Sequence, residues 1–497
     1  MFDKKINSVS LVGVGPGDEK LLTLRACECI KTADVIVYDN LVNPTILNRA
    51  KMSAKLIYAG KISGNHYLTQ DKINETIAEH ALTGEYVVRL KGGDPYIFGR
   101  GGEEAEYLLE RCIDFEIVHG ISSFYAGLGY AGIPVTFRGE AAEFHVFTGH
   151  KKQEEELDLN FKNIAKLEGS LVFLMGISNL SLIVQGLLSN GMNPDIGAAV
   201  IENGTRYNQR VFRGKLSNIE EIAKRENIIS PALIVVGNVC EKNLAFFQKD
   251  ILPLSGKNIL LTATKSLVEK MSPEFKKLGA NTCEMSLIAT KEMEIDKERF
   301  VSELELATHV LFTSSNGVDI FFDKIKKYDI DIRSLYNKKI CVIGSGSGEA
   351  LKKYGVNADF IPRKFDSKSF VEEILPKLDK SSKVLMLRAK LGNDNLPNGL
   401  KTAGIEFSDI PIYDTIIDYR RSFELNKEIK KFDYVVVASA SAAKALCEMI
   451  EDKSALLNRV VSIGPVTTKA LREFGIEELI TAKQYDVKGI VDAIKGL

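Results

Sequence analysis

The sequence lacks an excess of charge of either sign. Lys and Arg together number 65 and Asp and Glu 66, so the 497-residue chain has a formal net charge of -1. Without a global field there is no general attraction to nucleic acid or to a membrane surface, and an acidic ligand must be met by a local cluster of cations. The N-terminus shows no apolar stretch ending in a small-residue cleavage site, and no segment approaches the ~20 apolar residues that span a bilayer. We therefore expect a cytoplasmic protein that binds neither nucleic acid nor membrane.

Paired cysteines and metal-ligand spacings are absent as well. The seven cysteines are odd in number and scattered, without a CxxC pair, and the six histidines are equally dispersed. We therefore expect reduced, buried cysteines and no metal site.

The glycine loop LVGVGPGD, at residues 11–18, lacks both common phosphate-binding patterns. A dinucleotide fingerprint would need a third glycine where Asp18 stands, and no GKS or GKT follows as a P-loop requires. The loop allows close backbone approach, either to a ligand other than a phosphate or within a tight turn that holds no ligand. Asp18 therefore disfavours a nicotinamide-dependent oxidoreductase.

The length predicts about three or four folding units at roughly 100–200 residues each. Apolar runs such as VSLVGVG, DVIVYD and LVFLMG alternate with amphipathic stretches, which is typical of α/β sheets covered on both faces. Pro253 and Gly256 stand between two strand-like runs and predict a linker at about 246–256. We expect one domain at 1–245, with subdomains at about 1–118 and 119–245, and a second domain at 257–497.

The C-terminal half repeats itself. The stretch from Asn258 resembles the one from Lys383, and the stretch from His309 resembles the one from Tyr434, both at an offset of 125 residues. A third match, KKICVIGSGSGEALKKYG with NRVVSIGPVTTKALREFG, has an offset of 120 residues. Three matches in the same order at nearly one offset predict a duplicated α/β unit whose two lobes enclose a cleft.

The segment RLKGGDPYIFGRGGEE, at residues 89–104, is the most specific in the chain. It follows the strand-like run YVVRL, and its glycines expose backbone groups at the sheet edge where α/β proteins bind ligands. With VGVGPGD, VIVYDNLV, GKISGNH, YAGIPVTFRG, FLMG, IENGTRYNQRV and PALIVVG, it resembles the tetrapyrrole C-methyltransferase family, and most closely the uroporphyrinogen-III C-methyltransferases. The resemblance covers about residues 6–242 and implies a tetrapyrrole methylase fold of two α/β subdomains.

This resemblance implies a cleft that binds S-adenosylmethionine, the methyl donor. It implies a proton acceptor at Asp39 and a proton donor at Lys61. A methyl group goes to a pyrrole carbon and a proton then leaves a neighbouring carbon, so a carboxylate and an amine suit the chemistry. It implies cofactor contacts at nine further residues: Pro16, Gly92, Gly93, Asp94, Ile97, Ser122, Ser123, Met175 and Gly204. The family's members resemble one another as dimers, which implies a homodimer through this half.

The residues alone allow plainer interpretations of three of these positions. Asp39 could end its strand as a turn residue, Lys61 could be a surface lysine, and Met175, in an apolar strand, would by default be a core residue. The chain also departs from the family at three positions that bear on how substrate carboxylates are held, namely Ile62, His119 and Phe137.

In the C-terminal half, hydroxyl and glycine clusters end several predicted strands. Each cluster alone is typical of a helix cap, whereas repeated around one cleft they would offer neutral donors to a polyanion. The motifs TSSNGV, VIG, VLMLRA, PIYDT, VVASAS and SIGP resemble the uroporphyrinogen-III synthase family over about residues 257–497. The resemblance implies a bilobal flavodoxin-like domain that needs no cofactor, with lobe one at 257–291 plus 417–497 and lobe two at 292–416.

The synthase resemblance also implies site residues. Tyr413 matches a tyrosine proposed to assist departure of the substrate hydroxyl, although a half-buried strand residue is an equally good interpretation. Substrate contacts are implied at four hydroxyl residues, namely Thr313, Ser314, Ser439 and Thr467.

Together the two resemblances predict a bifunctional enzyme of tetrapyrrole biosynthesis. The C-terminal half would cyclise hydroxymethylbilane to uroporphyrinogen III with inversion of ring D. The N-terminal half would methylate this product twice to precorrin-2, which leads to sirohaem and cobalamin. The alternative is a methyltransferase for a later corrin precursor, joined to a non-catalytic, ligand-binding bilobal module.

Overall fold

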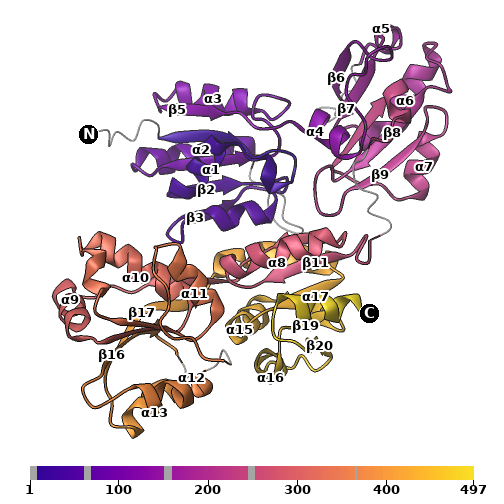
Figure 1. The fold of residues 1–497 in the computed structure, drawn as a ribbon. Coiled ribbons are helices and arrows are strands. Elements are labelled where there is room, and N and C mark those ends of the chain that lie inside the picture. The colour runs from indigo at the N-terminus through magenta and orange to yellow at the C-terminus, as the bar shows by residue number, and fades with distance from the viewer. Residues whose placement is uncertain are drawn as a thin grey trace. The chain divides into compact units, whose positions relative to one another are not determined.

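The computed structural model describes residues 8–60, 69–149, 159–244, 252–363, 367–392 and 394–496. The described residues form four five-stranded sheets connected by helices, which confirms the α/β fold class (Figure 1). They divide into unit one, Met1–Ser286 with Tyr419–Leu497, and unit two, Leu287–Asp418. Within the described ranges no helix is long and apolar enough to cross a membrane. Most of the expected linker, residues 246–251, lies outside the described residues.

The first sheet of unit one is parallel throughout, in the order β3-β2-β4-β1-β5. Its strands are β1 (Val9–Gly13), β2 (Val35–Tyr38), β3 (Lys55–Tyr58), β4 (Val87–Lys91) and β5 (Phe115–Val118). Strands β1 and β4 are buried along their whole length, as strands of a parallel sheet covered on both faces are. Helix α1 (Leu24–Thr32) packs on one face, and α2 (Gln70–Leu82) and α3 (Gly101–Leu109) pack on the other.

The second sheet of unit one is mixed, in the order β6-β7-β10-β8-β9. Its strands are β6 (Phe144–Thr148), β7 (Ser170–Leu174), β8 (Gly197–Glu202), β9 (Arg210–Lys215) and β10 (Ala232–Val236). Helices α6 (Leu180–Ser189) and α7 (Ile219–Arg225) pack on one face and α4 (Ser123–Tyr130) packs on the other, while α5 (Phe161–Ile164) follows β6. Strand β10 is antiparallel to both β7 and β8, so the carboxyl ends of β7 and β8 share one edge.

The third sheet of unit one is parallel, in the order β12-β11-β18-β19-β20. Its strands are β11 (Asn258–Thr262), β12 (Asn281–Glu284), β18 (Tyr434–Val437), β19 (Val460–Ser462) and β20 (Leu479–Thr481). This order is the 2-1-3-4-5 order of flavodoxin-like folds. Its helices are α8 (Lys265–Lys277), α14 (Ser422–Glu428), α15 (Ala440–Met449), α16 (Pro465–Glu473) and α17 (Val487–Lys495).

Unit two contains the fourth sheet, in the order β13-β17-β16-β14-β15, with β13 antiparallel to β17. Its strands are β13 (Ile288–Glu292), β14 (His309–Phe312), β15 (Lys339–Val342), β16 (Lys383–Ala389) and β17 (Glu406–Ile417). Helices α9 (Lys297–Leu306), α10 (Ser315–Lys327) and α11 (Ser345–Lys352) cover one face, and α12 (Ser367–Ile374) and α13 (Asn395–Thr402) cover the other.

The sequence repeat of the C-terminal half has a structural counterpart. Its three matched pairs begin β11 and β16, β18 and β14, and β19 and β15. In the third sheet β11, β18 and β19 are consecutive, and in the fourth sheet β16, β14 and β15 are consecutive in the same order. The repeated segments therefore occupy equivalent positions in two sheets.

Candidate active sites

Loops that follow four neighbouring strands gather at the carboxyl edge of the first sheet. Because the sheet is parallel, Gly15 after β1, Asp39 after β2, Gly93 after β4 and Gly120 after β5 leave the sheet on the same side. The amide of Gly15 donates to the carbonyl of Gly93 at 3.2 Å, and the amide of Gly93 donates to the carbonyl of Gly15 at 2.8 Å. The glycine loop and the GGDP loop of the sequence are therefore joined by backbone hydrogen bonds.

The glycines of these loops permit contact between the loops themselves. A Cβ atom on Gly13 would lie 2.6 Å from both the Gly120 nitrogen and the Gly93 carbonyl oxygen. A Cβ atom on Gly92 would lie 2.7 Å from Cβ of Leu41. Side chains at these positions would push the loops apart, so the edge keeps its shape only with glycine there.

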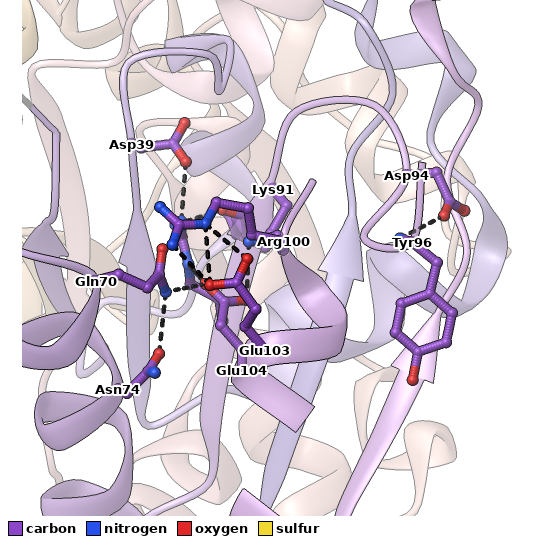
Figure 2. A network of polar contacts seen from close by, with 11 residues as sticks. Asp39, Gln70, Asn74, Lys91, Asp94, Tyr96, Arg100, Glu103 and Glu104 are labelled. Atoms are coloured by element: carbon purple, nitrogen blue, oxygen red, sulfur yellow. Dashed lines mark hydrogen bonds and ion pairs between the residues drawn. The ribbon is translucent and has the colours of Figure 1, made fainter. Parts of the chain in front are cut away.

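Asp94 is a buried carboxylate that ties two of the loops together. Its Oδ1 accepts from the Tyr96 amide at 2.8 Å, as Figure 2 shows, and its Oδ2 accepts from the Gly120 amide at 3.0 Å. Nδ1 of His119 lies 2.9 Å from the same Oδ2. Both carboxylate oxygens of Asp94 are therefore occupied by groups of the chain, which fixes the GGDP loop against the loop after β5.

Backbone strain is concentrated in the same region. Non-glycine residues with positive φ cost of the order of 1–3 kcal/mol each and cluster at functional sites. Five of the nine such residues in the described ranges lie in loops that carry or flank expected cofactor contacts, namely Phe98, Arg100, Met175, Asn203 and Thr205.

One loop of the second sheet and the end of helix α4 reach this region. Gly204 follows β8, and Oγ1 of the next residue, Thr205, accepts from the Asp18 amide at 3.2 Å. Asp18 also accepts from the Tyr130 hydroxyl at 2.8 Å, at the end of α4. The loop containing Pro16 and the loop containing Gly204 therefore meet.

The remaining expected cofactor contacts lie at the ends of elements. Met175 follows β7 and is 46% exposed, so its default interpretation as a core residue is wrong. Ile97 is 42% exposed in the loop after β4. Ser122 is the N-cap residue of α4, and its side chain makes no capping hydrogen bond there, while Ser123 begins the helix.

Asp39 stands between the interior of the first sheet and its surface. Its Oδ1 accepts from the Leu41 amide at 2.9 Å, and its Oδ2 lies 3.0 Å from Nη2 of Arg89 on β4. The turn interpretation of Asp39 is therefore correct, yet its side chain remains 25% exposed. Lys61 and Ile62 lie outside the described residues.

In unit two the structure brings two expected residues together. Tyr413, on β17, has its hydroxyl 2.7 Å from Oγ of Ser314. Ser314 also accepts from the Gly317 amide at 3.1 Å and so caps α10, and Thr313 precedes it. Tyr413 is 6% exposed, which makes it a buried rather than half-buried residue of its strand. Burial raises the pKa of Tyr413, although its hydrogen bond to Ser314 opposes the shift.

Ser439 and Thr467 belong to unit one. Ser439 caps α15 by accepting from the Ala442 amide at 3.1 Å, so the helix-cap interpretation is confirmed for Ser314 and Ser439 alike. Thr467 is not a cap, since it lies within the first turn of α16 and is 3% exposed.

The cysteines are free, and the expectation that all are buried is wrong for two of them. Cys112 is exposed and Cys27 is partly exposed, whereas the other five are buried. Within the ranges that the structure describes, no group of three His, Cys, Asp or Glu residues is arranged to hold a metal ion.

The structure adds functional candidates that sequence reasoning did not single out. Arg89 and Glu104 form a buried network with Asp39, and Thr205 holds the glycine loop through Asp18. The signal for Arg89 was present, because a charged residue in the apolar run YVVRL must find a partner when the strand is buried on both faces.

The chain thus combines two α/β subdomains, whose loops meet at one edge of the first sheet, with a duplicated α/β module. The family model of "Tetrapyrrole (Corrin/Porphyrin) Methylases" matches residues 8–220, and that of "Uroporphyrinogen-III synthase HemD" matches residues 269–492. A "Porphyrin biosynthesis protein HemD" of Ruminiclostridium josui is 36% identical over 98% of this chain and 97% of its own length. The chain belongs to this family, in which a tetrapyrrole methylase part precedes a uroporphyrinogen-III synthase part, and both resemblances found in the sequence are confirmed.

Two further proteins are similar to the N-terminal half. An "S-adenosyl-L-methionine-dependent uroporphyrinogen III methyltransferase" of Methanosarcina barkeri is 48% identical over 46% of this chain and 91% of its own length. A crystal structure of uroporphyrin-III C-methyl transferase from Thermus thermophilus, complexed with S-adenosyl homocysteine, is 35% identical with a TM-score of 0.40, and the match covers 46% of this chain and 97% of that one.

Proposed function

We propose that the chain is a bifunctional enzyme that closes hydroxymethylbilane to uroporphyrinogen III and methylates this product twice to precorrin-2, towards sirohaem and cobalamin. The observation that carries the proposal is the near full-length match to a porphyrin biosynthesis protein, with one family match in each half of the chain. The first domain would span 1–245 and the second 257–497, with lobe two of the second at 292–416.

The loops at the edge of the first sheet, together with those after β7 and β8 of the second, suit S-adenosylmethionine. Its amino-acid carboxylate needs donors, and the amides at the start of α4 lie beside Ser122, whose side chain does not cap them. Its adenine needs an apolar face, which the exposed side chains of Met175 and Ile97 offer. We assign Pro16, Gly92, Gly93 and Gly204 to the loops that enclose it, and Asp94 to holding the GGDP loop in place.

When bound, S-adenosylmethionine supplies a methyl group activated by a sulfonium centre. After the methyl group bonds to a pyrrole carbon, a neighbouring carbon must lose a proton. Asp39 accepts this proton, since its carboxylate is the partly exposed charge at the end of β2. Lys61, after β3, acts as the proton donor.

The synthase half acts on the leaving hydroxyl of hydroxymethylbilane. Tyr413 donates its phenolic proton to this hydroxyl, which leaves as water. Burial raises the pKa of Tyr413 and so keeps its proton in place at neutral pH. Ser314 fixes the direction of the phenol. Substrate contacts at Thr313, Ser439 and Thr467 remain predictions of the family resemblance.

We also infer a cytoplasmic homodimer that associates through the methyltransferase half. Free cysteines throughout the chain support a reducing compartment. The family resemblance supports the dimer, and light scattering on the full chain tests it.

Two incubations test the two activities separately. The full chain with uroporphyrinogen III and labelled S-adenosylmethionine should place label in the macrocycle, and no label would overturn the methyltransferase proposal. The full chain with hydroxymethylbilane alone should give the type III isomer. If only the non-enzymatic type I isomer forms, the C-terminal half is a ligand-binding module instead.

A further inference from the structure

We propose that Arg89, held by Glu104, is a positioning residue that fixes the carboxylate of Asp39 for proton abstraction. The inference rests on the proposed methyltransferase function and extends it to two buried residues.

The carboxylate of Asp39 is held in one orientation. One carboxylate oxygen, Oδ1, accepts from the Leu41 amide, and the other, Oδ2, pairs with Nη2 of Arg89 at 3.0 Å. Two donors on two different oxygens fix both the direction and the rotation of a carboxylate. Strands β2 and β4 are neighbours, with Val37 beside Arg89, so the sheet itself brings the guanidinium to this position.

The guanidinium of Arg89 is itself held by other groups. Its Nε lies 3.2 Å from Oε1 of Glu104, on α3, and its Nη1 donates to the Leu90 carbonyl at 2.8 Å. Glu104 is itself held by Nε2 of Gln70 at 3.1 Å and by Nζ of Lys91 at 2.8 Å, and Figure 2 shows these groups converging on it. The guanidinium is therefore fixed on three sides, and only its Nη2 reaches Asp39.

The charged side chains of this network differ in how far they are buried. The side chains of Arg89, Glu104 and Lys91 are 4%, 1% and 6% exposed, whereas that of Asp39 is 25% exposed. Two cations and two carboxylates compensate one another, so the charges can remain buried. Burial by itself would lower the pKa of Arg89, but the carboxylates of Asp39 and Glu104 outweigh it and raise that pKa, so the guanidinium stays charged.

An apolar core would serve stability as well as a buried ion network does. What the network adds is a rigid connection from α3 to its partly exposed carboxylate, that of Asp39. A misplaced reacting group costs about 100-fold in rate, so Arg89 acts on catalysis through Asp39 and not through contact with substrate.

A double-mutant cycle on the full chain tests the inference. Single-turnover methyl transfer to uroporphyrinogen III is measured for wild type, Arg89→Gln, Asp39→Asn and the double variant. We expect Arg89→Gln to slow transfer about 10- to 100-fold, and the double variant to be no slower than Asp39→Asn. KM for uroporphyrinogen III and calorimetric affinity for S-adenosylhomocysteine should stay within about twofold.

Lys324→Gln is the matched control, because it also removes a buried cation from a carboxylate: Nζ of Lys324 lies 2.5 Å from Oε1 of Glu292 in unit two and is not part of the Asp39 network. It should lower the melting temperature as Arg89→Gln does while retaining the rate of transfer. Arg89→Lys keeps the positive charge but loses the planar guanidinium with its paired N–H donors, so its rate of methyl transfer should lie between those of wild type and Arg89→Gln. If Arg89→Gln does not fold, Arg89→Lys takes its place in the test.

A double variant whose loss of rate is the product of the two single losses, or a loss of rate in Lys324→Gln equal to that of Arg89→Gln, would overturn the inference alone. An Asp39→Asn variant with full activity would overturn it too. A wild-type chain that transfers no methyl group would overturn the proposed function and the inference with it.

Discussion

The hydroxyl groups of Tyr413 and Ser314 lie 2.7 Å apart, and they join β17 to the N-cap of α10. Ser314 is thereby a helix cap and the partner of a buried phenol at once. This pair is the part of unit two on which the proposed ring closure depends.

Tyr413→Phe should slow ring closure to uroporphyrinogen III about 100-fold, since it removes the proposed proton donor but keeps the ring. Product isomers resolved by chromatography measure the effect. Tyr328→Phe is a matched control, because the Tyr328 hydroxyl donates to the Ile295 carbonyl in the same unit at 2.6 Å. Unchanged turnover in Tyr413→Phe would reduce this tyrosine to a packing role.

The pH dependence of ring closure should show no loss from tyrosine ionisation below about pH 10. The ordinary pKa of tyrosine is 10.0, and burial raises that of Tyr413, so the phenol keeps its proton up to that point. Initial rates of the wild type at rising pH test this. A decline centred below pH 10 that disappears in Tyr413→Phe would contradict the account.

Asp39→Asn and Lys61→Met should each slow methyl transfer by about 10²- to 10⁴-fold, because each removes a proposed acid–base group. The ring-closure rate of the same preparations is the internal control and should be unchanged. Equal loss of both activities would mean a folding defect and would leave neither residue a catalytic role.

Asp94→Ala should weaken binding of S-adenosylhomocysteine by about 10-fold or more, because loss of hydrogen bonds to a buried charge costs about 1.5–3 kcal/mol and frees the GGDP loop. Calorimetry measures this affinity. Asp452→Ala removes another carboxylate that accepts a backbone amide, from Ser454 at 3.1 Å, and should leave the affinity unchanged. Equal affinity in both variants would remove Asp94 from the cofactor site.

Much of the fold follows from apolar runs in the sequence. Runs such as VSLVGVG, DVIVYD and LVFLMG contain β1, β2 and β7, which are buried along their length. Strands β3 and β9 gave no comparable signal, because they lie at sheet edges and carry exposed or half-buried charged residues. Edge strands bury one side at most, so their apolar pattern is weak.

The site was less predictable than the strands. Motif order located the loops, yet the pairing of Arg89 with Asp39 depends on β2 lying beside β4, which no local pattern reports. Met175 looked like a core residue because it ends an apolar run. Its positive φ, of 55°, turns the chain out of the sheet and leaves the side chain exposed.

The central claim is that one chain performs both reactions in sequence. The most direct measurement is a coupled assay in which the full chain receives hydroxymethylbilane and S-adenosylmethionine, and the product is identified by mass and absorbance. The account predicts a macrocycle carrying two added methyl groups, with the absorbance of precorrin-2. An unmethylated type I macrocycle as the sole product would contradict it.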